Sequence, residues 1–336
     1  MSAVGEWRPT LPPGPPMQSG GGKRSSPLEW RWVDRLALGF AWCSGIGLCL
    51  IAAAIVIYMG YRGIEYLSPS LIAERPALST SQSGTGGFLD PLIGTVLLTV
   101  IGIVLAVPLA VGGAIWIAEY GRPTWLARMV ESAIEMVAGT PDIVIALFGL
   151  SIFQLGIFAP FSFKASGGGV FGKSFIAAGA MMSLIALPPM FTATRDGLQA
   201  VPAHMREAAF ALGKTRIATI RRVLLPSVRS NIATGVTLGI SRIIGDTAII
   251  VLLLGETLRL DPEGSVPGVS LLRGTGSTLT SYIYGNSPAG EGAAPQKAYA
   301  AAFVLLLFVL ALNLIVDRIG RSQADTTGMT VAGAVV

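Results

Sequence analysis

Six apolar stretches, each long enough to form a helix across a lipid bilayer, constrain the fold of this chain more than any other feature. They cover residues 36–59, 93–117, 129–155, 175–194, 232–254 and 298–316. A hydrocarbon core of about 30 Å needs roughly 20 apolar residues in helical conformation. Because lipid offers the backbone no hydrogen-bonding partner, such stretches are expected to be helices. We therefore predict an all-α integral membrane protein with six transmembrane helices.

The composition and the positions of the basic residues agree with this prediction. Hydrophobic residues make up 52% of the 336 residues and charged residues 13%, too little polar surface to cover a soluble globule. Most of the 24 Lys and Arg residues fall on one side of the membrane if the N-terminus is cytoplasmic. The positive-inside rule therefore predicts that both termini lie in the cytoplasm. Contact with anionic lipid head groups accounts for the net charge of +5, so no nucleic-acid partner is expected.

The apolar stretches and the segments between them suggest a division of the chain. Residues 1–30 are rich in Pro, Gly and Ser, which predicts a disordered tail. The predicted parts are a cytoplasmic tail (1–30), the first transmembrane helix (31–60), an external loop (61–90), a core with the other five apolar stretches (91–320) and a second cytoplasmic tail (321–336). Within the core, residues 195–230 are predicted to be a cytoplasmic loop and residues 255–296 a mostly irregular external loop.

The cytoplasmic loop carries a regular arrangement of small, acidic and turn-forming residues. Residues 207–226 read EAAFALGKTRIATIRRVLLP. Good helix formers precede Gly213, and glycine ends helices readily because it adopts a left-handed conformation. The segment is therefore predicted to form a helix, a turn and a second helix. Ala208 and Ala209 are small enough for the close approach of a partner. Phe210 and Leu212 would supply apolar contact, and Glu207 and Arg206 would set the orientation through charge pairs. An ordinary amphipathic loop without a partner is the alternative.

The spacing of this loop resembles the coupling loop of ABC importer permeases. It consists of Glu-Ala-Ala, three residues, Gly213, nine residues, an aliphatic residue, one residue, and the closing pair Leu225 and Pro226. Longer stretches resemble the phosphate-specific permeases PstA and PstC: GTVLLTVIGIVLAVPLAVGGAIWIAEYG from Gly94, AGTP from Ala138 and SRIIGDTA from Ser241. The similarity covers roughly residues 90–255.

Features near the ends of this similarity differ in the subtype that they favour. The closing apolar stretch, AYAAAFVLLLFVLALNLI from Ala298, and the short first external loop are more similar to PstA. The order Thr194-Arg195-Asp196 is more similar to PstC. The resemblance to PstA is favoured, and PstC remains the alternative.

The resemblance implies a type I ABC importer permease with a cytoplasmic coupling helix, located in a prokaryotic inner membrane. The residues implied to contact the ATPase and couple it to the permease are Glu207, Ala208, Ala209, Gly213, Leu225 and Pro226. The implied partners are a second permease subunit of the PstC type, two ABC ATPase subunits and an extracytoplasmic phosphate-binding protein. ATP and magnesium would bind to the ATPase subunits, so no cofactor is expected in this chain. The implied function is the import of inorganic phosphate. The alternatives are a permease for another oxyanion such as sulfate or molybdate, a secondary transporter or channel without an ATPase, and a membrane scaffold.

Two charged residues occur within the fifth apolar stretch. Arg242 and Asp246 are four residues apart, so on one continuous helix they would lie one turn apart on the same face. A charge within the membrane costs at least ~2.5 kcal/mol and is expected to face a pore or a partner. A guanidinium can bind two oxygens of an oxyanion at once, so Arg242 is predicted to line the substrate pathway. Asp246 is predicted to line it too, either pairing with Arg242 when the pore is empty or accepting a hydrogen bond from a protonated phosphate. The alternative is an Arg–Asp pair that only holds two helices together.

Two further charged residues are candidates for the pathway. Arg195, at the cytoplasmic end of the fourth stretch, is predicted either to line the pathway or to be a solvated positive-inside residue. Thr140-Pro141-Asp142 is typical of a helix start with Thr140 as the N-cap, so the third stretch is predicted to be broken there. Asp142 would stabilise the positive end of the second half-helix. A role for Asp142 in an anion pathway would require Arg242 or Arg195 nearby.

The sequence also contains a Walker A pattern whose context argues against ATP binding. Residues 167–174 read GGGVFGKS. A nucleotide-binding loop follows a buried strand in an α/β core, whereas this segment lies on the predicted external side and precedes an apolar stretch. The only histidine is His204 and both cysteines lie in the first apolar stretch, so no metal site has ligands at usable spacing. No catalytic set of nucleophile, base and acid can be assembled, and the chain is predicted not to be an enzyme.

Overall fold

The computed structural model describes residues 32–76, 86–121, 124–164, 169–255, 260, 269–288 and 294–321. The predicted tail 1–30 lies outside these residues, and so do residues 322–336 of the second predicted tail. Gly167, which begins the Walker A pattern, also lies outside them. The described residues form helices and short connections, with one isolated bridge between Lys164 and Val170.

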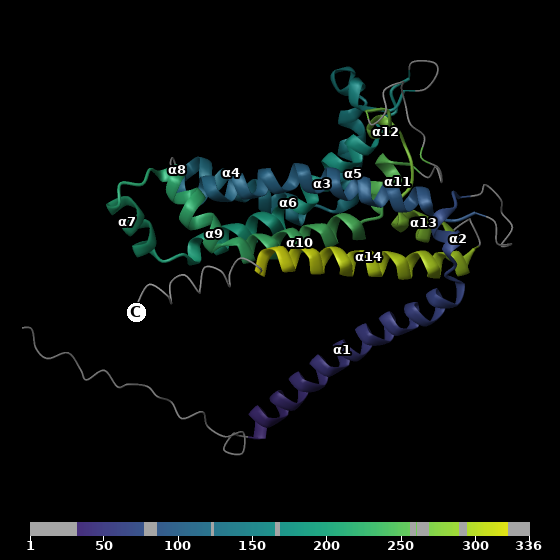
Figure 1. Ribbon diagram of the computed structural model, residues 1–336, viewed down its shortest axis with the longest axis horizontal. Coiled ribbons are helices and arrows are strands. Elements are labelled where there is room, and N and C mark those ends of the chain that lie inside the picture. The colour runs from purple at the N-terminus through teal and green to yellow at the C-terminus, as the bar shows by residue number, and fades with distance from the viewer. Residues whose placement is uncertain are drawn as a thin grey trace, which may run out of the picture. The chain divides into compact units, whose positions relative to one another are not determined.

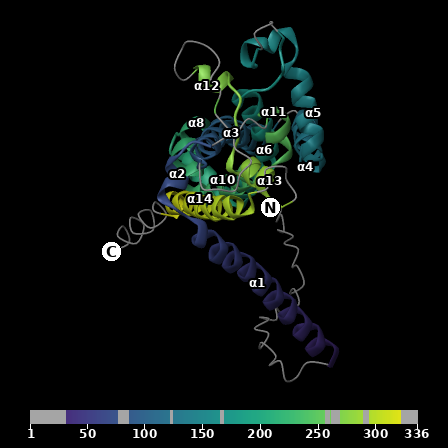
Figure 2. The same cartoon turned by 90° about the vertical axis from the view of Figure 1, so that its right-hand side faces the viewer.

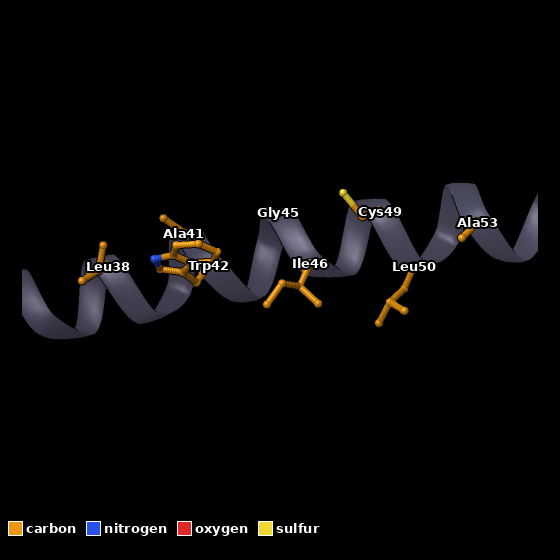
Figure 3. Close-up of a pocket in the computed structure, with 8 residues that line it drawn as sticks. All are labelled: Leu38, Ala41, Trp42, Gly45, Ile46, Cys49, Leu50 and Ala53. Atoms are coloured by element: carbon orange, nitrogen blue, oxygen red, sulfur yellow. The ribbon is translucent and has the colours of Figure 1, made fainter.

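The chain divides into two units, residues 1–57 and 58–336. Helix α1 (Trp32–Tyr66) supplies the described part of the first unit and the start of the second. Its apolar side chains are exposed, and a shallow hollow along the helix is lined by α1 alone (Figure 3). The lining residues are Leu38, Ala41, Trp42, Gly45, Ile46, Cys49, Leu50 and Ala53. Such an apolar surface is typical of a helix that lies against lipid or against another membrane helix.

The second unit contains the remaining helices. The long ones are α3 (Leu89–Ile115), which continues into the π-helical turn η2 (Trp116–Tyr120), α6 (Phe175–Ala200), α10 (Arg229–Gly245) and α14 (Pro295–Arg321). The intermediate ones are α4 (Thr124–Gly139), α5 (Asp142–Phe153), α7 (Ala203–Ala211) and α13 (Leu279–Asn286). The short ones are α2 (Pro69–Ala73), η3 (Gly156–Phe161), α8 (Arg216–Thr219), η4 (Ile220–Leu224), α9 (Leu225–Ser227), α11 (Ala248–Leu253) and α12 (Val269–Arg273).

Helices α3, α6 and α10 form the centre of the second unit. Helix α6 packs against both α3 and α10, and α14 packs along α10 (Figures 1 and 2). Glycine allows this close approach, because a side chain at Gly179 of α6 would collide with Ile101 of α3. A side chain at Gly239 of α10 would likewise collide with Met190 of α6. Helix association in lipid depends on such close packing, so small residues at these contacts stabilise the bundle.

The six apolar stretches are helical, but two of them are not continuous helices. Among the described residues, four helices are long and apolar enough to cross a membrane: α1, α3 with η2, α6 and α14. The stretch 129–155 consists of α4 and α5, which meet at 108° and would form a fifth span if counted together. This agrees with the predicted break. The prediction of one continuous helix over 232–254 is wrong, because α10 ends at Gly245 and α11 begins at Ala248.

The predicted irregular loop 255–296 contains more order than its composition suggests. It includes α12 and α13, and Thr278 and Ser281 form a capping box at the start of α13. Leu279 and Tyr282 of α13 are buried in an apolar cluster that includes residues of α14. A good cap and the burial of two apolar side chains explain a helix that the Gly and Pro content of the loop does not predict.

Candidate functional site

A cavity of about 270 Å³ lies where the break between α4 and α5 meets α6 and α10. Its lining residues are Val137, Ala138, Asp142, Ile185, Pro188, Pro189 and Arg242. Only Asp142 and Arg242 have charged or polar side chains in this set. The cavity therefore combines apolar walls with one cation and one carboxylate, the arrangement expected of a site that orients a small polar ligand.

Arg242 and Asp142 form an ion pair across this cavity. Nη2 of Arg242 donates to both carboxylate oxygens of Asp142, at 2.8 and 3.1 Å. The Arg242 side chain is 51% exposed and that of Asp142 is 26% exposed. Within the described part of the chain, Nε and Nη1 of Arg242 have no hydrogen-bonding partner. The guanidinium thus keeps three of its five N–H donors free for a ligand.

The partner of Arg242 differs from the one predicted. Asp246 does not lie on the same continuous helix, because the chain leaves α10 at Gly245 and Asp246 has an extended backbone, with ψ at 137°. The carboxylate of Asp246 accepts a hydrogen bond from the Ile249 amide at 2.8 Å, and the residue is buried. Asp246 therefore caps the first turn of α11. The predicted geometry of Arg242 and Asp246 one turn apart on one helix is wrong for this reason.

The break between α4 and α5 places Asp142 beside Arg242, but it is not capped as predicted. The hydroxyl of Thr140 donates to the Met136 carbonyl at 2.7 Å, so Thr140 is not the N-cap. Pro141 occupies the N-cap position and Asp142 is the first helical residue. A role for Asp142 in an anion pathway was expected to require Arg242 or Arg195 nearby. The ion pair between Asp142 and Arg242 meets this requirement.

Two consecutive prolines in α6 form part of the cavity wall. Pro188 and Pro189 lie inside the helix and have no amide N–H. The carbonyls of Leu184 and Ile185 therefore lose the donor that an α-helix would give them. A proline pair within an apolar stretch is visible in the sequence, and it is the signal that would have pointed to α6 as a wall of the site.

Arg195 lies further along α6 and is not among the cavity residues. Its guanidinium pairs with Glu131 of α4 at 3.2 Å and with the neighbouring Asp196 at 3.2 Å. It also lies over the Phe191 ring, 5.8 Å from its centroid. These contacts occupy Arg195, so the structure does not bring it together with Arg242.

A second candidate site is the coupling segment, residues 203–227, which includes α7, α8, η4 and α9. Helix α7 ends in a Schellman motif: the Gly213 amide donates to Phe210 and the Lys214 amide to Ala209. Gly213 has a φ of +71°, which glycine adopts without strain. The prediction of a helix, a turn at Gly213 and a second helix is confirmed. In Figure 1 the segment lies at one end of the bundle and α13 at the other.

The coupling segment is fixed to the bundle by a contact that the sequence did not indicate. Nε of Arg206 donates to Glu119 of η2 at 2.9 Å, while its Nη1 and Nη2 donate to the carbonyls of Val201 and Leu198, both at 2.8 Å. Glu119 is 7% exposed. The only sequence signal was an acid at the end of an otherwise apolar stretch.

The outer surface of the coupling segment is exposed and partly apolar. Leu212 is 79% exposed, Phe210 44% and Ile217 64%. Glu207 and Ala208 are exposed as well, whereas Ala209 is buried and Leu225 and Pro226 are half-buried. Of the predicted contact residues, Glu207, Ala208 and Gly213 are therefore accessible to a partner, and the others belong to the packing of the segment.

The end of the Walker A pattern has a structural role in the described residues. The Ser174 hydroxyl caps α6 by accepting from the Ala177 amide at 3.0 Å, and it donates to the Phe161 carbonyl at 2.6 Å. The segment before it contains η3 and an isolated bridge. This is not the strand, loop and helix arrangement of a nucleotide-binding loop.

Comparison with known proteins decides the family. Residues 110–325, more than half of the chain, match the family described as "Binding-protein-dependent transport system inner membrane component". The chain belongs to this family. The permease is therefore a multi-pass membrane protein of the ABC importer class.

Individual relatives and solved structures agree with this family. The permease is 28% identical over 285 residues to "Probable ABC transporter permease protein YqgH" of Bacillus subtilis (strain 168), covering 81% of this chain and 87% of that protein. It is 31% identical over 229 residues to "Phosphate transport system permease protein PstA 1" of Mycobacterium tuberculosis (strain ATCC 25618 / H37Rv), covering 68% of each chain. It is 29% identical over 237 residues to "Phosphate transport system permease protein PstC" of Xylella fastidiosa (strain 9a5c), covering 67% of this chain and 69% of that protein.

Among solved structures, the permease is similar to a chain of a bacterial alginate ABC transporter in complex with an alginate-bound periplasmic protein. The TM-score is 0.59 with 14% identity, and the match covers 86% of this chain and 95% of the other. At this identity the similarity concerns the fold alone. It supports the predicted type I ABC importer permease fold.

Proposed function

We propose that this permease is the membrane subunit through which an ATP-driven importer carries inorganic phosphate, and that Arg242 binds the anion. The main support for the proposal is the environment of Arg242. Its side chain is half-exposed in a cavity, and its Nε and Nη1 have no partner among the described residues. A guanidinium with open donors binds an oxyanion at two oxygens. Relatives named as phosphate transport permeases support phosphate as the anion.

The coupling segment supports the second half of the proposal, an ATPase partner. Two ABC ATPase subunits would dock on the exposed surface that includes Leu212, Phe210 and Glu207. Because Arg206 and Glu119 tie α7 to the end of α3, a movement of the docked ATPase would be passed to α3 and α6. ATP and magnesium would bind in those subunits, while this chain transmits the work.

The remaining partners follow from the same proposal. A second permease subunit of the PstC type would complete the pathway, and an extracytoplasmic phosphate-binding protein would deliver the anion. The permease would lie in a prokaryotic inner membrane with both termini in the cytoplasm, which places the coupling segment on the side where ATP is present.

Uptake of radiolabelled phosphate in a strain that lacks its own phosphate importers tests the proposal. We expect Arg242→Ala to reduce uptake at least about tenfold, since a charge-assisted pair of hydrogen bonds is lost. Arg62→Ala is the matched control, because Arg62 is an exposed arginine of α1 that pairs with its helix neighbour Glu65. Undiminished uptake by Arg242→Ala, at equal abundance in the membrane, would show that Arg242 does not bind the anion.

A further inference from the structure

The carboxylate of Asp142 has a position that the import of an anion does not explain. It lies in the same cavity as Arg242 and touches the guanidinium that the proposal assigns to the anion. A negative group beside an anion site weakens binding of a second negative group unless something compensates for the repulsion. The position of Asp142 therefore bears on which anions the cavity accepts.

The other charged and polar groups around the cavity do not offer such compensation. Asp246 is turned to the Ile249 amide, and the rest of the lining side chains are apolar. Pro188 and Pro189 bring no amide N–H to the wall of α6. Arg242 is the only side-chain donor among the lining residues, and Nη2 is already shared with Asp142. The cavity is thus short of donors and holds an acceptor that a ligand can use.

We propose that Asp142 makes the Arg242 cavity selective for oxyanions that carry a proton, such as hydrogen phosphate, over fully ionised ones such as sulfate. The anion binds the free Nε and Nη1 donors of Arg242, and its own hydroxyl donates a hydrogen bond to the Asp142 carboxylate. Phosphate keeps at least one proton at neutral pH and can make this bond, whereas sulfate cannot. Within apolar walls the unrelieved repulsion between sulfate and the carboxylate is larger than in water.

This inference rests on the proposed binding of an anion by Arg242, so the experiment separates the two. The full-length permease, with the partners that purify with it but without any binding protein, is placed in lipid nanodiscs. The unfolding temperature is measured against rising phosphate or sulfate at constant ionic strength, because a ligand that binds only the native state stabilises it by RT ln(1 + L/Kd), where L is the concentration of free ligand. The concentration dependence gives an apparent Kd for each anion.

The wild type is expected to bind phosphate at least about tenfold more tightly than sulfate, the size of one hydrogen bond to a charged group. Asp142→Asn removes the charge and is expected to bring the two Kd values to within about threefold by the same reasoning. Asp142→Glu keeps the carboxylate and is expected to keep the preference, which controls for damage to the start of α5.

The following results would contradict either the inferred selectivity or the proposed function. If Asp142→Asn keeps the wild-type preference for phosphate, Asp142 is only a structural partner of Arg242. If Asp142→Asn lowers the Kd of both anions by the same factor, Asp142 only competes with the anion for Arg242. Either result shows that the inferred selectivity is wrong. If Asp142→Asn cannot be purified folded, Asp142→Glu decides, since a lost preference in that variant would also contradict it. If Arg242→Ala binds phosphate as tightly as the wild type, or the wild type shows no response to phosphate, the proposed function itself fails.

Discussion

Arg206 and Arg242 belong to the same permease but have opposite surroundings. Arg206 is 22% exposed, and all three of its guanidinium nitrogens donate to groups on the bundle. Arg242 is 51% exposed and uses a single nitrogen on one carboxylate. A guanidinium whose three nitrogens are all engaged holds structure together, whereas one with two open nitrogens can take up a ligand. The difference supports the proposals that Arg206 links the coupling segment to α3 and that Arg242 binds the ligand.

The largest effect is expected from removing the guanidinium of Arg206. Arg206→Met leaves the nearly buried Glu119 carboxylate without its cation, which should destabilise the native state by about 3 kcal/mol. The unfolding temperature of the purified permease measures this. The double variant with Glu119→Gln removes the uncompensated charge and should regain most of the loss; no recovery would show that the pair is not coupled.

A smaller effect is expected at the exposed surface of the coupling segment. Leu212→Ser should reduce co-purification of the ATPase subunits about tenfold or more, as for the central residue of an interface, while the unfolding temperature stays unchanged. Leu155→Ser is the matched control, because Leu155 is an exposed leucine in the turn after α5. An equal loss of ATPase co-purification in both variants would contradict a docking role for Leu212. Full co-purification of the ATPase subunits with the Leu212 variant would show that they do not dock through Leu212.

The shape of the coupling segment depends on Gly213, and replacing this glycine should have a smaller effect again, on the stability of the permease. A Cβ at Gly213 meets no atom, so Gly213→Ala is opposed only by its φ of +71°, at a cost of about 1–2 kcal/mol. Gly112→Ala, at a helical glycine of α3 with equally open surroundings, should be neutral or stabilising by up to ~1 kcal/mol. Equal unfolding temperatures for the two variants would show that the Schellman turn does not matter for stability.

The smallest effect is expected near the cavity, at Asp246. Asp246→Ala should lower stability by about 1 kcal/mol, because the Ile249 amide loses its acceptor. Asp246→Asn should keep most of the stability, since the amide oxygen of asparagine can also accept the hydrogen bond from the Ile249 amide. If instead Asp246→Asn is as unstable as the alanine variant, the charge of Asp246 matters beyond capping and its predicted place in the pathway regains support.

The sequence predicted the features that depend on local patterns. The apolar stretches predicted the helices, the residues around Gly213 predicted the turn of the coupling segment, and Thr140-Pro141-Asp142 predicted the break in the third stretch. Each of these follows from residues close together in the chain. The break was predicted correctly although the capping residue was not, because Thr140 bonds back to its own helix.

The sequence did not predict partners that are distant in the chain. Arg242 and Asp142 are separated by 100 residues, and Arg206 and Glu119 by 87. Helical spacing alone suggested Asp246 as the partner of Arg242, but the end of α10 at Gly245 removes that neighbour. Which charges meet across helices depends on how the helices pack, and the glycine contacts between α3, α6 and α10 set that packing.

Binding of the anion to the open donors of Arg242 can be observed in an electron cryo-microscopy map of the assembled transporter, held in lipid with saturating phosphate. We expect density for the anion within hydrogen-bonding distance of Arg242 Nε and Nη1 and next to the Asp142 carboxylate. Density for phosphate elsewhere along the pathway, with Arg242 still bonded to Asp142 alone, would contradict it.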